Sequence, residues 1–364
     1  MKEAIISLPH TTYSVHTGAS LLQQAGSLIR HRLPKARRAA IIGDETAMSF
    51  HLGTLERSLN DARFSLIAHS IPSGEAHKTL NTVSEIYTLL LSNKFERSDV
   101  VISLGGGVSG DTVGFAAATY LRGVPFVNVP TTLLSMVDAS VGGKTGVNMP
   151  QGKNLVGAFY QPELVIVDVT VLNTLPQREF VSGLAECVKH AIIRSPELFT
   201  YIESHVDQIL NKDEQVLTSL VADNVAIKAA VVMADEKESS VRAHLNFGHT
   251  FAHAIEKECG YGTYLHGEAV SLGIVAAGYL ALKRGLVSQA ELDRTEMLLS
   301  KLSLPVRSSV LPDKAQLIEA MYQDKKVQNS LIRLVLQKNI GDCLIVNDAT
   351  THELAAAWDY ITAG

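Results

Sequence analysis

Carboxylate, amine and imidazole side chains recur at helical spacing in the second half of the chain. Glu186 and Lys189 stand at i and i+3 on one predicted helix face, and His249 and His253 stand at i and i+4 on another. His266 opens a further helical stretch. A carboxylate and two imidazoles from separate helices could hold a divalent metal and leave one position open, as in catalytic zinc sites. Spacing alone does not select the ligands, because a chain with 13 histidines can contain such a pair by chance.

A glycine-rich stretch, SLGGGVSGDTVG at residues 103–114, follows an apolar run. Gly105, Gly107 and Gly110 have the G-x-G-x-x-G spacing, which lets the backbone turn sharply and approach a pyrophosphate at a helix N-terminus. The acidic residue that the dinucleotide fingerprint places about twenty positions later is not evident. The stretch is compatible with a dinucleotide site, a bare phosphate site or a simple strand-to-helix turn.

Two glycine–lysine segments lie downstream of this stretch. Gly142-Gly143-Lys144 and Gly152-Lys153-Asn154 each place an amine beside glycine backbone, a combination that brings amide donors and positive charge to an anion. Two solvated surface loops are the alternative interpretation. Two such segments within about ten residues of each other, both after the glycine-rich turn, favour anion binding.

Further cations lie in the second half of the chain. Lys228 stands among apolar residues, and Arg242 and Asn246 precede His249. The planar guanidinium of an arginine suits a carboxylate. A substrate that carries both a phosphate and a carboxylate would explain so many cations in an acidic protein.

The elements that must position these residues fall into two groups. Four β-rich runs, each ending in a turn residue, alternate with helical segments before residue 176: RRAAIIGDE, SDVVISLGG, GVPFVNVPTT and ELVIVDVT. Continuous apolar strands that alternate with helices predict a mostly parallel sheet covered on both faces. Ligands bind such sheets at the carboxyl ends of the strands, where the glycine-rich stretch falls.

After Pro176 the pattern becomes mainly helical. Ser195 and Pro196 indicate a helix start with serine as N-cap and proline in the first position, and LIRLVLQKNIGDCLIV predicts a small hairpin. The sequence therefore predicts a Rossmann-like α/β domain over residues 1–176 and a mainly α-helical domain over residues 177–364. We expect the active site in the cleft between them.

The composition of the chain argues against several classes of protein. The 364 residues are 46% hydrophobic with a net charge of −5, which fits a globular protein and argues against a nucleic-acid binder. Three dispersed cysteines suggest neither a disulfide framework nor a thiolate zinc site. The N-terminus lacks the apolar core of a signal peptide, and the run of 14 near-apolar residues at 269–282 is short for a membrane span. These features predict a cytoplasmic protein.

Seven motifs, in this order along the chain, resemble those of the 3-dehydroquinate synthase family: GGGVSGD, TYLRGVPFVNVPTTLLSMVDASVGGKTGVN, GKNLVGAFYQP, GLAECVKHAII, LNFGHTFAHAIE, LHGEAV and DKK. The resemblance runs through nearly the whole chain. It implies a lyase of the shikimate pathway, which makes chorismate and the aromatic amino acids. The family converts 3-deoxy-D-arabino-heptulosonate 7-phosphate into 3-dehydroquinate and phosphate, through transient oxidation by NAD, phosphate elimination, re-reduction, ring opening and an intramolecular aldol step.

The resemblance also implies roles for individual residues. The metal ligands, for zinc or cobalt, would be Glu186, His249 and His266. NAD contacts would come from Asp44, Ser73, Gly74, Glu75, Ala76, His77, Lys78, Gly106, Gly107, Val108, Ser109, Gly110, Asp111, Thr131, Thr132, Lys144, Lys153, Val171, Leu172, Asn173 and Thr174. The substrate would contact Arg122, Asp138, Lys144, Asn154, Lys189, Lys228, Arg242, Asn246, His253 and Lys325. The catalytic residues would be His253 as proton carrier, with Lys144, Lys189, Arg242 and Asn246.

The family is dimeric, and Arg122 matches an arginine that reaches the phosphate pocket of the neighbouring subunit. The stretch after DKK lacks the glycine expected in the hairpin turn, so the choice between Lys325 and Lys326 stays open. Three alternatives are kept: a sibling cyclase acting on sedoheptulose 7-phosphate or glucose 6-phosphate, a metal-dependent polyol dehydrogenase, and a catalytically silent binding protein. No nucleic-acid or membrane partner is expected.

Overall fold

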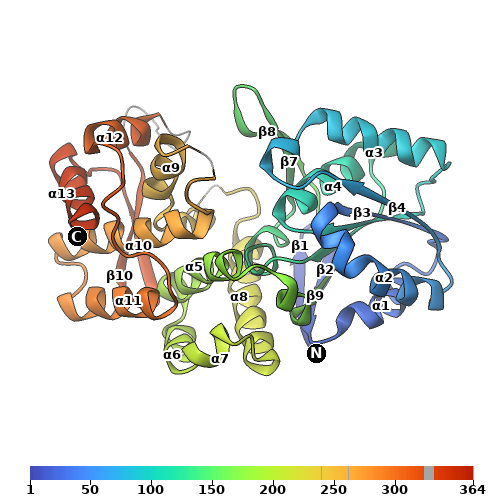
Figure 1. The fold of residues 1–364 in the computed structure, drawn as a ribbon, viewed down its shortest axis with the longest axis horizontal. Helices are drawn as coiled ribbons and strands as arrows, with labels where there is room; N and C mark the ends of the chain where they lie inside the picture. The colour runs from blue at the N-terminus through green and yellow to red at the C-terminus, as the bar shows by residue number, and fades with distance from the viewer. Residues whose placement is uncertain (239, 261, 324–331, 364) are drawn as a thin grey trace. The chain divides into compact units, whose positions relative to one another are not determined.

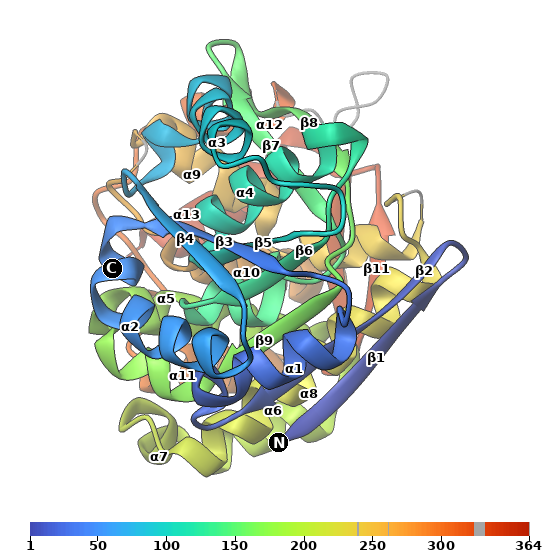
Figure 2. The same cartoon turned by 90° about the vertical axis from the view of Figure 1, so that its right-hand side faces the viewer.

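The computed structural model describes residues 1–238, 240–260, 262–323 and 332–363. Its contacts divide the chain into two units. Unit 1 comprises Met1–Pro176 and Glu214–Met233, and unit 2 comprises Gln177–Asp213 and Ala234–Gly364. Figures 1 and 2 show both units, which are described here one at a time.

Unit 1 is built on a seven-stranded sheet in the order β1-β2-β9-β6-β5-β3-β4. All neighbouring strands pair in parallel except β1, which pairs antiparallel to β2 at one edge. The strands are β1 (Lys2–Leu8), β2 (Thr11–Gly18), β3 (Arg38–Asp44), β4 (Ser65–Ile71), β5 (Val100–Gly105), β6 (Phe126–Pro130) and β9 (Leu164–Asp168). The four predicted runs became β3, β5, β6 and β9, which are almost wholly buried, as both-face coverage requires.

Helices cover both faces of this sheet. α1 (Ala25–Arg32) and α2 (Glu45–Asp61) lie on one face, and α3 (Leu80–Ser92) and α4 (Gly107–Thr119) on the other (Figures 1 and 2). An apolar core that includes Ile42, Ile86 and Val101 fills the space beneath α3 and α4. Short helical segments connect these elements: η1 (Leu21–Gln24), η2 (Glu75–His77), η3 (Tyr120–Arg122), η4 (Ser135–Ala139) and η5 (Val169–Thr174).

A separate hairpin pairs β7 (Lys144–Met149) with β8 (Gly152–Phe159). The sequence suggested two loops here, around Lys144 and Lys153. The structure instead starts strand β7 at Lys144 and strand β8 at Gly152. Val147 is fully buried in the same core as α4, which explains why this polar-looking stretch becomes a hairpin.

Helix α8 (Glu214–Ala234) lies in unit 1 up to Met233. The predicted domain boundaries placed it in the second domain, so this part of the prediction was wrong. The residues of α8 pack with unit 1: Lys228 pairs with Asp138, and Asp223 lies 3.8 Å from the Lys2 ammonium. The helix is long and apolar enough to span a membrane by length and composition alone, and half of that apolar window is buried inside the protein. The burial and these ion pairs fit a core helix of unit 1.

Unit 2 is mainly helical, as predicted. Its elements are α5 (Gln177–Arg194), α6 (Pro196–Ser204), α7 (Val206–Leu210), η6 (Val241–Asn246), α9 (His249–Glu258), α10 (His266–Lys283), α11 (Gln289–Lys301), α12 (Lys314–Tyr322), β10 (Leu334–Asn339), β11 (Asp342–Val346) and α13 (Thr351–Thr362). The hairpin β10–β11 was expected, and so was the start of α6, where the Ser195 hydroxyl accepts from Leu198 N–H and Pro196 takes the first helical position.

Candidate active site

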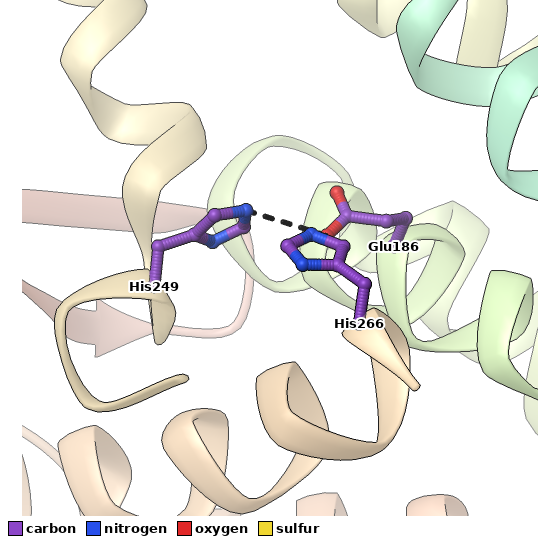
Figure 3. Close-up of side chains that lie close together, drawn as sticks. All are labelled: Glu186, His249 and His266. Atoms are coloured by element: carbon purple, nitrogen blue, oxygen red, sulfur yellow. Dashed lines mark ion pairs between the residues drawn. The ribbon is translucent and has the colours of Figure 1, made fainter. Parts of the chain in front are cut away.

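Three potential metal ligands converge in unit 2 from three helices. Glu186 lies on α5, while His249 and His266 are the first residues of α9 and α10 (Figure 3). Nε2 of His249 and Nε2 of His266 lie 3.5 and 3.7 Å from Oε1 of Glu186. Metal–ligand bonds of about 2.0–2.1 Å would place ligand atoms about 3.3 Å apart around a tetrahedral zinc ion. The three residues therefore match a divalent-metal site in both ligand type and spacing.

Glu186 is a fully buried carboxylate without ordinary hydrogen bonds. Neither of its oxygens has a hydrogen-bond partner among the described residues, although Lys189 forms an ion pair with it. Burial alone would raise the pKa of Glu186, but the charges of Lys189, His249 and His266 outweigh burial and hold the pKa well below its usual range. A buried carboxylate that stays ionised and accepts no regular hydrogen bond is suited to bind a cation.

The other ring nitrogen of each histidine is fixed by a second contact. Nδ1 of His249 lies 3.1 Å from the carbonyl oxygen of Phe247, and Nδ1 of His266 lies 3.4 Å from Oε1 of Glu256. Burial would lower the pKa of His266, but the ion pairs of its ring nitrogens with Glu186 and Glu256 outweigh burial and raise the pKa to about 10. Both histidines therefore present Nε2 to the cluster, the arrangement in which an outer hydrogen bond orients a metal ligand.

The sequence analysis missed Glu256. It stands seven residues after His249, at helical spacing, so it shares the α9 face with His249 and His253. The His253 ring centroid lies 5.7 Å from that of His249, which places the predicted proton carrier beside the cluster.

Turn η6 carries the predicted substrate residues Arg242 and Asn246. The buried carboxylate of Asp235 accepts hydrogen bonds from Ser240 N–H at 2.6 Å and from Arg242 N–H at 3.1 Å. Arg242 is almost fully buried and donates to the carbonyl of Glu236. Asn246 Nδ2 donates to Glu238 Oε1 at 3.0 Å. The structure thus holds this turn in place through backbone and side-chain contacts within unit 2.

In unit 1 the glycine-rich stretch forms a strand–turn–helix. β5 ends at Gly105, Gly106 is the N-cap of α4, and no side chain caps the helix start. Free N–H groups at a helix N-terminus form an anion-binding site. A Cβ atom at Gly105 would lie 2.4 Å from Ser109 Oγ and 2.5 Å from Asp44 Oδ2, so the site requires glycine there. At Gly107 the corresponding nearest atom is 3.4 Å away, so packing leaves room for a side chain.

Asp44, an acidic residue predicted to contact NAD, lies beside the glycine-rich turn. It ends β3, the strand next to β5, and its Oδ2 accepts a hydrogen bond from Ser109 Oγ at 3.2 Å. Its Oδ1 caps α2 by accepting from Ala47 N–H at 2.9 Å, and Ser73 Oγ lies 3.4 Å away. The acid lies upstream because β3 precedes β5 in the chain while lying beside it in the sheet.

The remaining predicted cofactor residues follow neighbouring strands. Thr131 N–H donates to the Gly105 carbonyl at 2.9 Å, and a Cβ at Gly106 would lie 3.2 Å from Thr132. In η5, Thr174 Oγ1 lies 2.9 Å from His51 Nε2. The segment after β4 has the composition Ser73, Gly74, Glu75, Ala76, His77 and Lys78, and the start of α4 contributes Val108, Gly110 and Asp111. Two other predicted residues, Val171 and Leu172, are buried, so only their backbone could contact a ligand; Asn173 is exposed.

Several predicted substrate residues also lie in unit 1. Lys228 of α8 pairs with Asp138 of η4. Lys144, Lys153 and Asn154 all lie on the β7–β8 hairpin. Lys228 and Asp138 are brought together by the fold of unit 1, since 90 residues separate them in the sequence.

Arg122 is exposed at the end of η3. It has a positive φ of 69°, and its neighbours Leu121 and Gly123 have φ of 49° and 120°. Non-glycine residues rarely adopt such angles, and they concentrate at functional sites. Lys325 and its alternative Lys326 lie outside the described residues.

Comparison with known proteins adds to this geometry. The family model described as 3-dehydroquinate synthase N-terminal matches residues 68–182, and the model described as 3-dehydroquinate synthase C-terminal matches residues 183–327. The chain belongs to the 3-dehydroquinate synthase family. The resemblance noted in the sequence is thereby confirmed.

Curated relatives cover nearly the whole chain. A 3-dehydroquinate synthase from Pseudomonas fluorescens (strain SBW25) is 47% identical over 96% of this chain and 94% of its own length. One from Rippkaea orientalis is 44% identical over 96% of this chain and 95% of its own length. A solved 2-epi-5-epi-valiolone synthase from Streptomyces hygroscopicus, with NAD+ and Zn2+ bound, has a TM-score of 0.87 and 30% identity, covering 97% of this chain and 98% of its own.

Proposed function

We propose that the chain catalyses the conversion of 3-deoxy-D-arabino-heptulosonate 7-phosphate into 3-dehydroquinate and phosphate. The observation that carries this proposal is its 47% identity to a curated 3-dehydroquinate synthase over 96% of the chain. The intact Glu186, His249 and His266 cluster argues against a catalytically silent relative.

The proposal includes a divalent metal, zinc or cobalt, held by Glu186, His249 and His266. The fit is supported by the buried Glu186 oxygens that accept no regular hydrogen bond, and by the two Nε2 atoms within 3.7 Å of Oε1. Such a metal acts as a Lewis acid toward a substrate hydroxyl. Within this proposal, the three protein ligands leave a fourth position for substrate.

We also propose NAD as the cofactor, with the dinucleotide bound at the carboxyl edge of the unit 1 sheet. Uncapped N–H groups at the start of α4 would take the pyrophosphate, and Asp44 would accept hydrogen bonds from ribose hydroxyls. NAD supplies hydride transfer when bound. Thr131 and Thr132 would close the site with backbone and hydroxyl groups next to the glycine-rich turn.

The cations would recognise and stabilise an anionic substrate. Arg242 is buried and suits a carboxylate, because its guanidinium can donate two parallel hydrogen bonds. Lys144 and Lys228 would balance phosphate and developing negative charge. Lys189 would change partners, since in the structure it pairs with Glu186.

Proton transfer falls to His253 in this proposal. Its ring lies beside His249, at 5.7 Å between centroids, and is only partly buried. An imidazole can take up and return a proton near neutral pH, which elimination and ring closure both require. The phosphate of the substrate is a second candidate acceptor.

The assembly proposed is a cytoplasmic homodimer in which Arg122 reaches the phosphate site of the partner subunit. The exposed position of Arg122 and the positive φ angles at Leu121 and Arg122 support a backbone held in a costly shape for a contact. Subunit complementation tests this assembly. Arg122→Ala is mixed with a second inactive variant so that mixed dimers form, and recovery of activity in the mixture is the expected result if Arg122 acts in the site of the partner subunit.

Phosphate release is the experiment that tests the activity. The purified protein receives 3-deoxy-D-arabino-heptulosonate 7-phosphate, Zn2+ and substoichiometric NAD, while absorbance at the NADH band is followed. Many phosphates released per NAD, without lasting NADH, are the expected result. Release only from sedoheptulose 7-phosphate or glucose 6-phosphate would instead indicate a sibling cyclase, and net NADH accumulation would indicate a polyol dehydrogenase.

A further inference from the structure

A network of side-chain hydrogen bonds joins the β7–β8 hairpin to the segment 73–78 within unit 1. Its centre is Asn148, near the end of β7, which is the last residue of a family motif and was assigned no role from the sequence. Nδ2 of Asn148 donates to Oε1 of Glu75 at 2.7 Å, and Oδ1 of Asn148 accepts from Asn154 N–H at 2.9 Å. The backbone N–H of Asn148 donates to the Lys78 carbonyl at 2.8 Å. One residue therefore holds both strands of the hairpin to the segment 73–78.

Lys78 extends the network to the glycine-rich helix. Its ammonium group, on a side chain only 4% exposed, lies 2.5 Å from Oδ2 of Asp111 and 2.5 Å from Oδ1 of Asn154. Asp111 belongs to the first turns of α4. Burial raises the pKa of Asp111, and the Lys78 charge opposes that rise. The contacts thus run from α4 through Lys78 to the hairpin.

Asn154 depends on this network for its backbone shape. Its φ is +54°, in the left-handed region that side chains other than glycine rarely adopt. Asparagine tolerates that region better than most residues. The hydrogen bond from its N–H to Asn148 and the contact of its Oδ1 with Lys78 hold it there.

We propose that Asn148 is a positioning residue that couples cofactor binding to substrate binding. This rests on the proposed function and on the roles that the family resemblance implies, in which segment 73–78 contacts NAD while Lys144 and Asn154 contact substrate. When NAD binds, it orders segment 73–78. Because Asn148 joins this segment to the hairpin, the hairpin and its residue Asn154 are then held in position for substrate. Coupling between two sites is reciprocal, so substrate must raise NAD affinity by the same factor by which NAD raises substrate affinity.

The hairpin does not need Asn148 to fold. Val147 is fully buried against the core beneath α4, and the Thr145 hydroxyl donates to the Ala158 carbonyl across the hairpin at 2.8 Å. Loss of the Asn148 side chain should therefore loosen the hairpin from segment 73–78, leaving the backbone bond to Lys78 and the Lys78–Asn154 contact, while the hairpin itself persists. This separates a coupling role from a purely structural one.

The test compares Asn148→Ala and Asn148→Asp with a matched control. Alanine removes both side-chain links, whereas aspartate keeps the acceptor for Asn154 and places a carboxylate against Glu75. The control is Asn81→Ala, because Asn81 makes an exposed hydrogen bond of the same length, 2.7 Å to Glu85, within α3 alone. Calorimetric titration of the zinc-loaded protein with NAD, with and without a non-eliminable phosphonate analogue of the substrate, gives the coupling factor without turnover.

We expect the analogue to raise the NAD affinity of the wild-type protein and of Asn81→Ala by about 5- to 150-fold, the usual range for coupled sites. In both Asn148 variants this factor should fall toward one. A wild-type factor retained in Asn148→Ala, or a wild-type protein that binds NAD without any analogue-dependent gain, would overturn the coupling and leave the proposed function standing. A wild-type protein that binds no NAD would overturn both.

Discussion

The two candidate binding regions are held in different ways. In unit 2, Glu186, His249 and His266 project from three helices, and the glutamate is fully buried. In unit 1, most of the predicted cofactor residues lie at or after strand ends and the predicted hairpin residues lie on β7 and β8, and several of them, such as Ser73 and Asn154, are exposed. Packed helices fix the first set, whereas hydrogen bonds between loops fix the second.

This difference teaches where each kind of binding draws its precision. A metal tolerates little error in ligand position, and side chains on packed helices supply that precision when the protein folds. Loops linked by hydrogen bonds open at lower free-energy cost than a packed core. We therefore expect substitutions in the cluster to abolish binding, and substitutions in the loop network to weaken or uncouple it.

The largest effect is expected at Glu186. Glu186→Gln removes the charge that binds the metal, so zinc content and turnover should both fall to background. It also leaves the Lys189 ammonium buried without its counter-charge, which costs about 3–5 kcal/mol in comparable buried pairs. Zinc content by atomic absorption, phosphate release and a thermal melt measure the three consequences.

His266→Ala separates metal loss from destabilisation, because it removes a ligand and keeps the Glu186–Lys189 pair. It too should lose zinc and activity while melting closer to the wild type. Either variant with full zinc and normal turnover would refute the ligand assignment.

A smaller effect is expected at Glu256, which orients His266 without binding the metal. Glu256→Ala should lower zinc affinity by about 10- to 100-fold, as loss of outer-shell partners does elsewhere. Chelator competition on the purified protein measures the affinity. Glu258→Ala is the matched control, since Glu258 lies on the same helix and its ion pair with Lys257 is long, at 4.0 Å. Equal zinc affinity in the two variants would show that Glu256 does not orient the ligand.

Sequence patterns predicted what depends on local periodicity. The buried strands β3, β5, β6 and β9, the strand–turn–helix at Gly105 and the helical second half all follow from apolar spacing and turn residues. The placement of α8 in unit 1 could not be predicted in this way. Its apolar residues indicate that the helix is buried, but they do not indicate which unit buries it. Its ion pair with Asp138 joins residues 90 positions apart.

Within the candidate site the same limit applies. Asp44 was found only through resemblance, since the pairing of β3 with β5 decides that it lies beside the glycine-rich turn. Glu256 could have been found from local spacing, because it stands at i+7 from His249 on one helix face. A search for histidines alone does not detect it. Asn148 ends a family motif, but the motif gives it no role, because its partner Glu75 comes from another part of the chain.

A still smaller effect is expected in the glycine-rich turn. A Cβ on Gly105 would crowd Ser109 and Asp44 and separate their 3.2 Å hydrogen bond. Overpacking of this kind costs about 1–3 kcal/mol, so Gly105→Ala should lower both the melting temperature and NAD affinity, the latter by about tenfold.

Gly107→Ala sharpens the test, because packing leaves room for that methyl group. It should leave the melting temperature unchanged and still weaken NAD binding, if the pyrophosphate approaches the backbone at this residue. Calorimetric titration with NAD measures both variants. Wild-type NAD affinity in Gly107→Ala would contradict that approach.

The smallest effect is expected in unit 2 at Arg284 and Glu353, a pair outside the metal cluster. The guanidinium of Arg284 binds Glu353 through two hydrogen bonds of 2.7 and 2.9 Å and lowers the pKa of Glu353 to about 2. A carboxyl whose pKa is lower in the folded state stabilises the fold above its unfolded pKa, near 4.3, and loses that contribution as the pH falls toward 2. Since the pair is partly exposed, we discount its contribution to about 1 kcal/mol.

Glu353→Gln should therefore lower the free energy of unfolding by about 1 kcal/mol at pH 7, and by less at pH 3, with zinc affinity unchanged. Urea melts at the two pH values measure this. Asp359→Asn is the control, because the pair of Asp359 with Lys314 is equally short at 2.7 Å but far more exposed, and it should show almost no change. A change in zinc affinity in Glu353→Gln would mean that the cluster is sensitive to the surrounding helical scaffold, and the contrast between a site fixed by packing and one fixed by hydrogen bonds would then fail.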